Sequence, residues 1–324
     1  AAGLLCYSGA ASAQDDLLWA KGAGGASADK GKSISAHADG TSVVTGEFSG
    51  TATFGAQVLT SAGGSDIFVA RYAADGSLLW VKQAGGVDND IGLGTSAHTD
   101  GTSVVTGRFN GMATFGPGEE NETVLDSAGE SDIFVARYAA DGSLLWAKKA
   151  GGDGYDFGYS VSAHADGTSV VTGEFRNGPM TFGSGEANET ILASVGEYDI
   201  FVARYAADGS LLWARHVTGD HLDYICGRSI SAHADGTSVV TGEFGGTAIF
   251  GCGEENETVL VSGGGDIFVA EYAADGSLLG VTKSVCADYW GYRYGLSAHA
   301  DGTSGRSYEC RVVSECSSGC STYY

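Results

Sequence analysis

The feature of this sequence that most constrains its fold is a long phrase that recurs at a nearly fixed interval. The phrase SAHADGTSVVTG carries a histidine, and successive histidines are separated by 61, 66, 69 and 66 residues. A second phrase, DIFVARYAADGSLLW, recurs after 66, 67 and 67 residues. Such a period is typical of repeat architectures, in which each unit buries its apolar faces against its neighbours. The histidines are His37, His98, His164, His233 and His299, and the second phrase begins at Asp66, Asp132, Asp199 and Asp266.

Each complete unit contains four short apolar runs separated by turn residues. In the unit near residues 66–109, Asp-Gly pairs and a glycine-rich loop separate runs that are rich in Val, Ile, Phe and Tyr. Asp-Gly is a strong hairpin signal, because Gly accepts a positive φ and Asp can bond to its own backbone. The pattern predicts a four-stranded antiparallel meander in each unit.

The faces of these strands distinguish between all-β folds. In the run Asp66–Tyr72, Ile67 and Val69 alternate with Phe68 and Ala70, so both faces are apolar. A sheet with one wet face would alternate apolar with polar residues. Small sheets stacked around an axis cover both faces, and the sequence therefore predicts an all-β β-propeller. We expect SAHADGTSVVTG to form the outer hairpin of each blade.

The ordered motifs also resemble a known repeat. The order DIFVARY, DGSLLWAK, GGxxxDxG and DGTSVVTG is similar to the bacterial β-propeller repeat family called SBBP, over about residues 15–304. This chain departs from the family at the His of SAHADG, where the family often has an Asp near the end of the third strand. The resemblance implies an exported propeller domain and supplies no catalytic residues.

We expect the propeller domain to cover residues 14–304 and to contain about five units in an incomplete or open ring. The units lie near residues 16–48, 66–109, 132–175, 199–244 and 266–304. The pattern fails after Ser304, and the Cys- and Ser-rich tail 305–324 matches no other part of the chain. A closing strand with a tail, a diverged fifth blade, and a truncated or misread gene end all fit this failure.

The first residues predict export. Ala1–Ala10 are small or apolar, and Ala11-Ser12-Ala13 fits the pattern before a signal-peptide cleavage point. We therefore predict that residues 1–13 are a signal-peptide remnant and that the protein is secreted or lies at the cell surface. Six cysteines would then remain, which allow 15 disulfide pairings. These cysteines are Cys226, Cys252, Cys286, Cys310, Cys316 and Cys320, and without paired CxxC spacing they predict no zinc site.

Charge limits the classes of partner. The net charge of -23 over 324 residues argues against nucleic acid and against an anionic membrane surface, because both attract basic proteins. No stretch approaches the roughly 18 apolar residues of a membrane span. We therefore expect no nucleic-acid partner and no membrane insertion, and we expect a protein or glycan surface ligand.

Three repeated features are candidate sites. Acidic residues after the second strand suit weak Ca²⁺ binding, although they lack the order of a known calcium loop and a turn-forming role is favoured. These residues are Asp29, Asp90, Asp156, Asp223 and Asp288. The Asn-Glu-Thr triplets are glycosylation sequons, with candidates at Asn121, Asn188 and Asn256. The repeated histidines favour a hydrogen-bonding or packing role at a strand end over metal ligation.

The repeated tryptophans favour packing between blades over sugar binding. They are Trp19, Trp80, Trp146 and Trp213, and the fifth position is Gly280, which predicts a last blade that is packed differently or partly exposed. We find no catalytic motif and predict no catalytic residues and no cofactor other than Ca²⁺. The sequence thus predicts an exported, non-catalytic binding or surface-adhesion scaffold. The alternatives are a glycan-active lyase or glycosidase and a lectin with one sugar site per blade.

Overall fold

The computed structural model describes residues 18–195, 197–219 and 225–284, and within these ranges the chain contains only strands and turns. The signal-peptide prediction, His299, Asp223, Asp288 and the tail 305–324 lie outside the described residues. The described strands confirm the all-β prediction.

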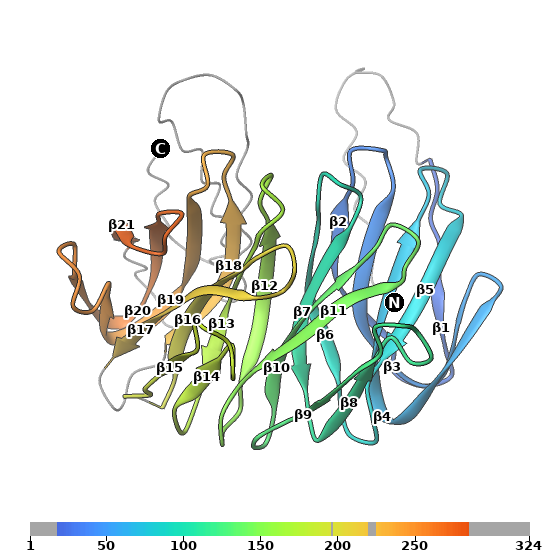
Figure 1. The fold of residues 1–324 in the computed structure, drawn as a ribbon, viewed down its shortest axis with the longest axis horizontal. Coiled ribbons are helices and arrows are strands. Elements are labelled where there is room, and N and C mark those ends of the chain that lie inside the picture. The colour runs from blue at the N-terminus through green and yellow to red at the C-terminus, as the bar shows by residue number, and fades with distance from the viewer. Residues whose placement is uncertain (1–17, 196, 220–224, 285–324) are drawn as a thin grey trace.

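Four antiparallel meanders of four strands each account for most of the fold, and we call them the first to fourth sheets (Figure 1). The first contains β2 (Lys30–Ala36), β3 (Ser42–Phe54), β4 (Gln57–Tyr72) and β5 (Leu78–Ala84). The second contains β6 (Ile91–Ala97), β7 (Ser103–Phe109), β10 (Asp132–Tyr138) and β11 (Leu144–Ala150). The third contains β12 (Phe157–Ala163), β13 (Ser169–Phe175), β16 (Asp199–Tyr205) and β17 (Leu211–Gly219). The fourth contains β18 (Ile225–Ala232), β19 (Ser238–Phe250), β20 (Thr258–Tyr272) and β21 (Leu278–Ser284).

Short strands connect or extend these sheets. Strand β1 (Ala23–Gly25) pairs with the end of β3, and the end of β17 pairs with β19, which joins the third sheet to the fourth. Two small hairpins complete the described strands. They are β8 (Met112–Phe115) with β9 (Thr123–Asp126), and β14 (Met180–Phe182) with β15 (Thr190–Leu192).

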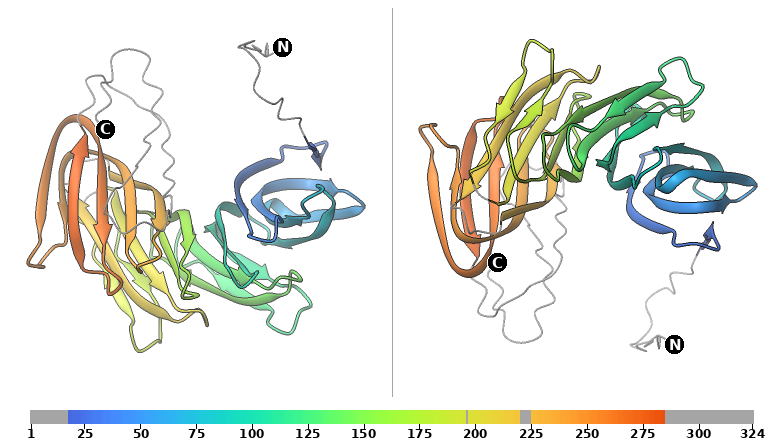
Figure 2. Two further views of the ribbon diagram at one scale, coloured as in Figure 1. Left: turned by 90° about the horizontal axis from the view of Figure 1, so that it is seen from above. Right: turned by 90° about the horizontal axis from the view of Figure 1, so that it is seen from below.

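The first strands of the four sheets, β2, β6, β12 and β18, lie next to one another, and we call them the inner strands. Serine side chains join them: Ser35 Oγ accepts the Ala97 amide at 3.1 Å, and Ser162 Oγ accepts the Ala232 amide at 3.0 Å. Viewed along the strands, the sheets follow one another around an open arc (Figure 2). This arrangement is a β-propeller. The SAHADGTSVVTG hairpin therefore begins on the inner strand, and its assignment as an outer hairpin was wrong.

The sheets also begin and end at different points of the chain from the units expected from the sequence. The expected meander over 66–109 is divided between two sheets, because β6 pairs with β7 and not with β5. The glycine-rich loop after β5 carries the chain across to the second sheet. The buried Asp90 carboxylate holds this loop by accepting the Gly86 amide at 2.7 Å and the Asn110 amide at 3.1 Å.

The Asp-Gly hairpins form as predicted. In the first sheet, His37 and Thr41 close the turn through a backbone bond of 2.8 Å, and Asp39 Oδ1 accepts the Thr41 amide at 2.9 Å. Gly40 has a φ of 83°, which is the left-handed conformation that favours glycine. The turns of this type, together with the Ala-Ala-Asp-Gly turns, lie at the same end of every sheet. We call this end the rim.

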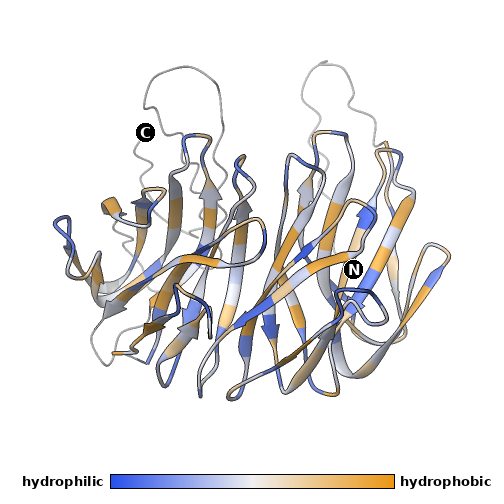
Figure 3. Ribbon diagram, in the orientation of Figure 1, coloured by the Kyte–Doolittle hydropathy of each residue, from blue (hydrophilic) through white to orange (hydrophobic). Residues whose placement is uncertain are grey.

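Both faces of the two middle sheets are covered, as the apolar patterns predicted. All seven residues of β10 and all seven of β16 are buried. One continuous core contains Ile67 and Trp80 of the first sheet together with Phe134 and Tyr138 of the second. Hydrophobic segments accordingly recur along the strands, while the turns are more polar (Figure 3). Packing between neighbouring sheets thus supplies the core of this fold.

Candidate functional site

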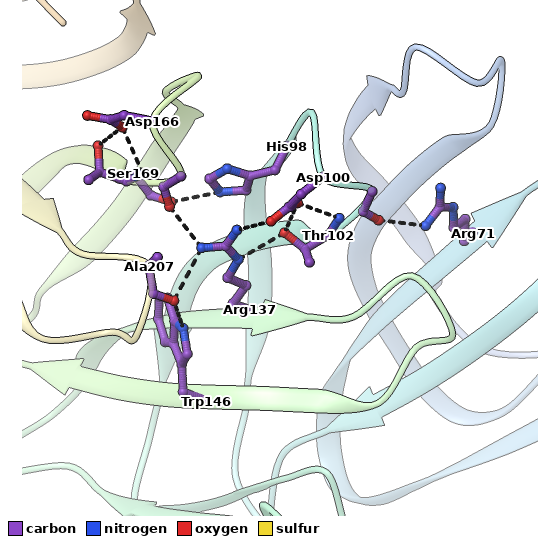
Figure 4. Close-up of polar contacts among 12 residues, drawn as sticks. Arg71, His98, Asp100, Thr102, Arg137, Trp146, Asp166, Ser169 and Ala207 are labelled. Atoms are coloured by element: carbon purple, nitrogen blue, oxygen red, sulfur yellow. Dashed lines mark hydrogen bonds and ion pairs between the residues drawn. The ribbon is translucent and has the colours of Figure 1, made fainter.

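A polar network at the rim joins each sheet to the next. In the second sheet its centre is the buried Arg137. The Arg137 guanidinium donates to Asp100 Oδ2 at 2.8 Å and to Thr102 Oγ1 at 2.9 Å within its own sheet. It also donates to the carbonyl oxygens of Gly167 at 2.8 Å and Ala207 at 3.2 Å, which belong to two turns of the third sheet (Figure 4). One side chain thus fixes both turns of its neighbour.

Equivalent arginines repeat this arrangement. Arg71 and Arg204 are also buried, and each bonds to an aspartate and a threonine of its own sheet and to two carbonyls of the next. The Arg71 partners are Asp39, Thr41, Gly101 and Ala140. The Arg204 partners are Asp166, Thr168, Gly236 and Ala274. In the fourth sheet the corresponding residue is Glu271, because DIFVARY becomes DIFVAEY.

The tryptophans cooperate with these arginines. Trp146 Nε1 donates to the Ala207 carbonyl at 2.9 Å, which is the carbonyl that Arg137 also reaches (Figure 4). The Trp146 ring stacks against Tyr205 of the third sheet, with centroids 6.5 Å apart. Trp146 is 9% exposed. The predicted packing role of the tryptophans is confirmed, and the rings are covered by the next sheet instead of facing a sugar.

The repeated histidines are part of the same contact between sheets. His98 Nε2 lies 3.0 Å from Ser169 Oγ of the third sheet (Figure 4). In the same way, His164 Nε2 lies 3.0 Å from Ser238 Oγ of the fourth sheet. Burial lowers the pKa of His98 and of His164 to about 4, and the nearby arginine charges act in the same direction. Both imidazoles are therefore neutral at pH 7. Their predicted strand-end hydrogen-bonding role is confirmed.

The aspartates of the rim remain partly open to solvent. The side chains of Asp39, Asp100 and Asp166 are 57%, 54% and 55% exposed, although each is paired with a buried arginine. Partial burial acts to raise the pKa of Asp100, but hydrogen bonds from Thr102 and the Arg137 charge hold it below its usual range. The rim therefore presents ionised carboxylates at a regular spacing on a backbone that the network holds in place.

The described calcium candidates lie at the opposite end of the sheets. Asp90 and Asp156 are buried, and Asp156 Oδ2 accepts the Gly152 amide at 2.9 Å, as Asp90 does with Gly86. Asp29 is less buried and accepts the Gly25 amide at 2.7 Å. The described residues contain no group of three or more His, Cys, Asp or Glu side chains that could hold a metal ion. These aspartates bond to backbone in the turn-forming manner, and Ca²⁺ binding stays a prediction.

The sequons lie in exposed loops. Asn121, Asn188 and Asn256 are all exposed, and each donates its side-chain amide to the carbonyl at the start of an outer strand. For Asn121 this acceptor is Leu144, at 3.0 Å. Glycosylation of these positions stays a prediction. Within the described ranges, Cys226 is buried and Cys252 is exposed, and they form no disulfide with each other.

The amino-acid sequences of the inner strands differ from sheet to sheet at the strand ends opposite the rim. Every inner strand contains a β-bulge at the same place, and the bulged residue differs in each sheet. The four bulged residues are Lys32, Leu93, Tyr159 and Arg228. Two positions earlier, the residues are Lys30, Ile91, Phe157 and Cys226. Bulges redirect side chains and occur often beside binding sites. In nearly identical repeats, this divergence marks a second candidate site.

Two curated proteins are similar to parts of this chain. It is 25% identical over 225 residues to the uncharacterized WD repeat-containing protein L264 of Acanthamoeba polyphaga mimivirus, a match that covers 56% of the chain and 16% of the relative. It is 28% identical over 149 residues, 46% of the chain and 15% of the relative, to the regulatory protein FlaEY of Caulobacter vibrioides. The chain thus spans about a sixth of the length of each.

No protein-family model matches the chain. The similarity to a WD repeat-containing protein agrees with the propeller-like repeat fold that the sheets display. The described residues include no helix long and apolar enough to cross a membrane.

Two sets of residues escaped the sequence reasoning. The buried arginines carried a signal, because each sits in an otherwise apolar strand, where an arginine is costly unless it is paired. The divergent inner-strand residues carried one as well, because they break a nearly exact repeat. Neither signal could predict the contact between sheets, because this contact joins residues far apart in the sequence. Arg137 and Ala207, for example, are separated by 70 positions.

Proposed function

We propose that this chain is the propeller domain of an exported, non-catalytic binding scaffold of the SBBP type. It contacts a protein or glycan partner through the loops at the ends of its blades. The proposal rests on the fold and on the similarity to a WD repeat-containing protein. Its location outside the cell rests on the small-residue pattern at the N-terminus.

The rim is the observation that carries this proposal. Arg71, Arg137 and Arg204 each tie a turn of one sheet to two turns of the next, so the described loops form a continuous, rigid surface. A pre-organised surface loses little conformational entropy when it binds a partner. The exposed carboxylates of Asp100 and its equivalents favour a partner with basic groups.

Adding positive charges beside the network aspartates tests the rim without replacing any residue of the network. Ala38, Thr99 and Ala165 lie in exposed positions next to the network aspartates. The triple variant A38R/T99R/A165R should weaken binding of a captured extracellular partner by about tenfold or more, because rim charges control both approach and specificity. The matched control is Val87→Arg, an exposed residue in the loop between β5 and β6, at the end of the sheets opposite the rim.

The measurement is partner capture from the extracellular medium, followed by surface plasmon resonance on the purified pair and screening on a glycan array. Binding that the triple variant loses and V87R keeps supports the rim as the contact surface. Equal binding by wild type and the triple variant contradicts it. Cleavage of an arrayed glycan would identify an enzyme instead.

A further inference from the structure

A row of cationic and aromatic side chains crosses three sheets at the divergent ends of the inner strands. Arg108, from β7, lies over the Phe157 ring at 5.0 Å from its centroid. Phe157 stacks on Tyr159 in β12, with centroids 5.6 Å apart and planes inclined by 12°. Arg228 of β18 lies over the Tyr159 ring at 5.1 Å. We call Arg108, Phe157, Tyr159 and Arg228 the inner row.

The residues of the inner row occupy positions at which the repeated units have different amino acids. The residues aligned with Arg108 in the other sheets are Glu47, Glu174 and Glu243. The second sheet thus replaces an acidic residue with a basic one, while the surrounding phrase SVVTGxF is unchanged. Because a repeat array copies its structural residues, a local charge reversal beside a bulge points to a specific role for these side chains.

The electrostatics of the row favour an anion. Arg228 is paired with Glu243 at 2.8 Å, and Arg176, which also lies over the Phe157 ring, is paired with Glu174. Among the described residues, Arg108 donates only to the neutral amide oxygen of Asn110, at 3.3 Å. Within the described ranges, no carboxylate forms an ion pair with Arg108. This cation lies in a chain with a net charge of -23 and is only half-buried. A cation with no internal counter-charge attracts an external one.

The stacking also leaves donors available. A guanidinium carries five N–H donors in one plane, and Arg108 uses only Nη1 for its bond to Asn110. These donors match the two oxygens of a carboxylate or phosphate in a bidentate pair. Arg108 already contacts the Phe157 ring and the Asn110 amide oxygen, so binding a ligand costs less entropy than ordering a free side chain would.

We propose that the inner row is a binding site for a small ligand that carries an oxyanion, either a carboxylate or a phosphate group, and that Arg108 is its principal contact. The site is separate from the rim. The proposal rests on the proposed binding function only in that it gives the same scaffold a second ligand. A small anion is favoured over a polyanion, because the net charge of -23 on the whole chain repels an extended negative chain.

Titration calorimetry on the full chain tests this site, with succinate in one arm and inorganic phosphate in the other. Wild type should bind at least one of the two anions, and the arm that responds identifies the oxyanion. Arg108→Gln should weaken that binding by about tenfold or more, because it removes a charge-assisted bidentate contact. The matched control is Lys21→Gln, which removes one exposed positive charge away from the row and should leave the affinity within about twofold.

Two further variants keep the test independent of folding. Arg108→Lys keeps the charge but loses the planar fork, and should give intermediate affinity. Arg228→Gln should weaken binding less than R108Q, because Arg228 is already paired. The proposal is overturned if neither anion binds, or if R108Q binds as tightly as wild type. Partner capture at the rim that persists in R108Q would then leave the scaffold function standing.

Discussion

The second and fourth sheets share most of their repeat phrases but differ at a pair of residues that, in the second sheet, reaches the next sheet. In the second sheet, Arg137 and Trp146 are paired across β10 and β11, and both bond to the Ala207 carbonyl of the third sheet. In the fourth sheet, the same paired positions hold Glu271 and Gly280. We call Arg137 and Trp146 the reaching pair, and both of its residues are replaced in the fourth sheet.

This joint replacement separates two roles within one repeat. The strands and Asp-Gly turns of the fourth sheet form without the pair, so Arg137 and Trp146 are not required for a sheet to fold. Their equivalents attach one sheet to the next. A Cβ placed at Gly280 would meet no described atom within 4 Å, which agrees with the expectation that the last blade is packed differently or partly exposed.

The largest effect is expected when the second sheet is given the residues of the fourth. The double variant R137E/W146G should lower the free energy of unfolding by more than about 4 kcal/mol. It deletes a buried indole, and it places a carboxylate beside Asp100 and two carbonyl oxygens that Arg137 otherwise bonds. Chemical denaturation followed by circular dichroism measures this loss. A loss below about 1 kcal/mol would show that the pair does not carry the contact between sheets.

A smaller effect is expected when the space under a tryptophan is filled. Gly142 has a φ of 88°, and a Cβ there would lie 2.7 Å from the Trp80 ring. Gly142→Ala should therefore destabilise the protein by about 2–3 kcal/mol, through backbone strain and displacement of the indole. Gly280→Ala is the control and should change stability by less than about 0.5 kcal/mol. Equal effects in the two variants would contradict this difference between sheets.

The buried aspartates should make stability depend on pH. Burial raises the pKa of Asp90 and of Asp156 to about 7 from 3.8, and the nearby carboxyls of Asp66 and Asp132 act in the same direction. The folded protein therefore holds protons that the unfolded chain has released. This stabilisation is complete below about pH 4 and is lost as the pH rises through 7.

Between pH 6 and 8, the free energy of unfolding should fall by about 1 kcal/mol for each of these carboxyls. The neutral histidines, His98 and His164, act in the opposite direction below pH 6.5, so the upper half of this window isolates the aspartates. Urea melts across the window measure the slope. The variant D90N/D156N removes both titrating groups while an amide oxygen at each position can still accept one backbone N–H, so it should flatten the slope. An unchanged slope would assign the pH dependence to other groups.

The smallest effect is expected from the reverse exchange. The variant E271R/G280W gives the fourth sheet the reaching pair, but the described residues offer it no following sheet. Its stability should change by less than about 0.5 kcal/mol in a thermal melt with a urea series. A gain of more than about 2 kcal/mol would mean that a further sheet accepts the pair, which would sharpen the comparison by showing where the arc continues.

The sequence by itself determined the repeat, the all-β class, the Asp-Gly turns and the burial of both sheet faces. These are local properties, because side-chain alternation and turn chemistry are encoded within a few neighbouring residues. The packing of the tryptophans and the strand-end role of His98 also followed from their positions in apolar or turn-flanking segments.

Only the tertiary structure decided how the strands are grouped into sheets. Strands β5 and β6 follow each other in the chain but lie in different sheets, and the buried Asp90 carboxylate bonds the loop between them to Asn110, 20 residues away. The Arg137 network and the inner row likewise join side chains that no local pattern brings together. A repeated sequence specifies its units through local geometry, but the contacts between units form only when one copy lies against the next.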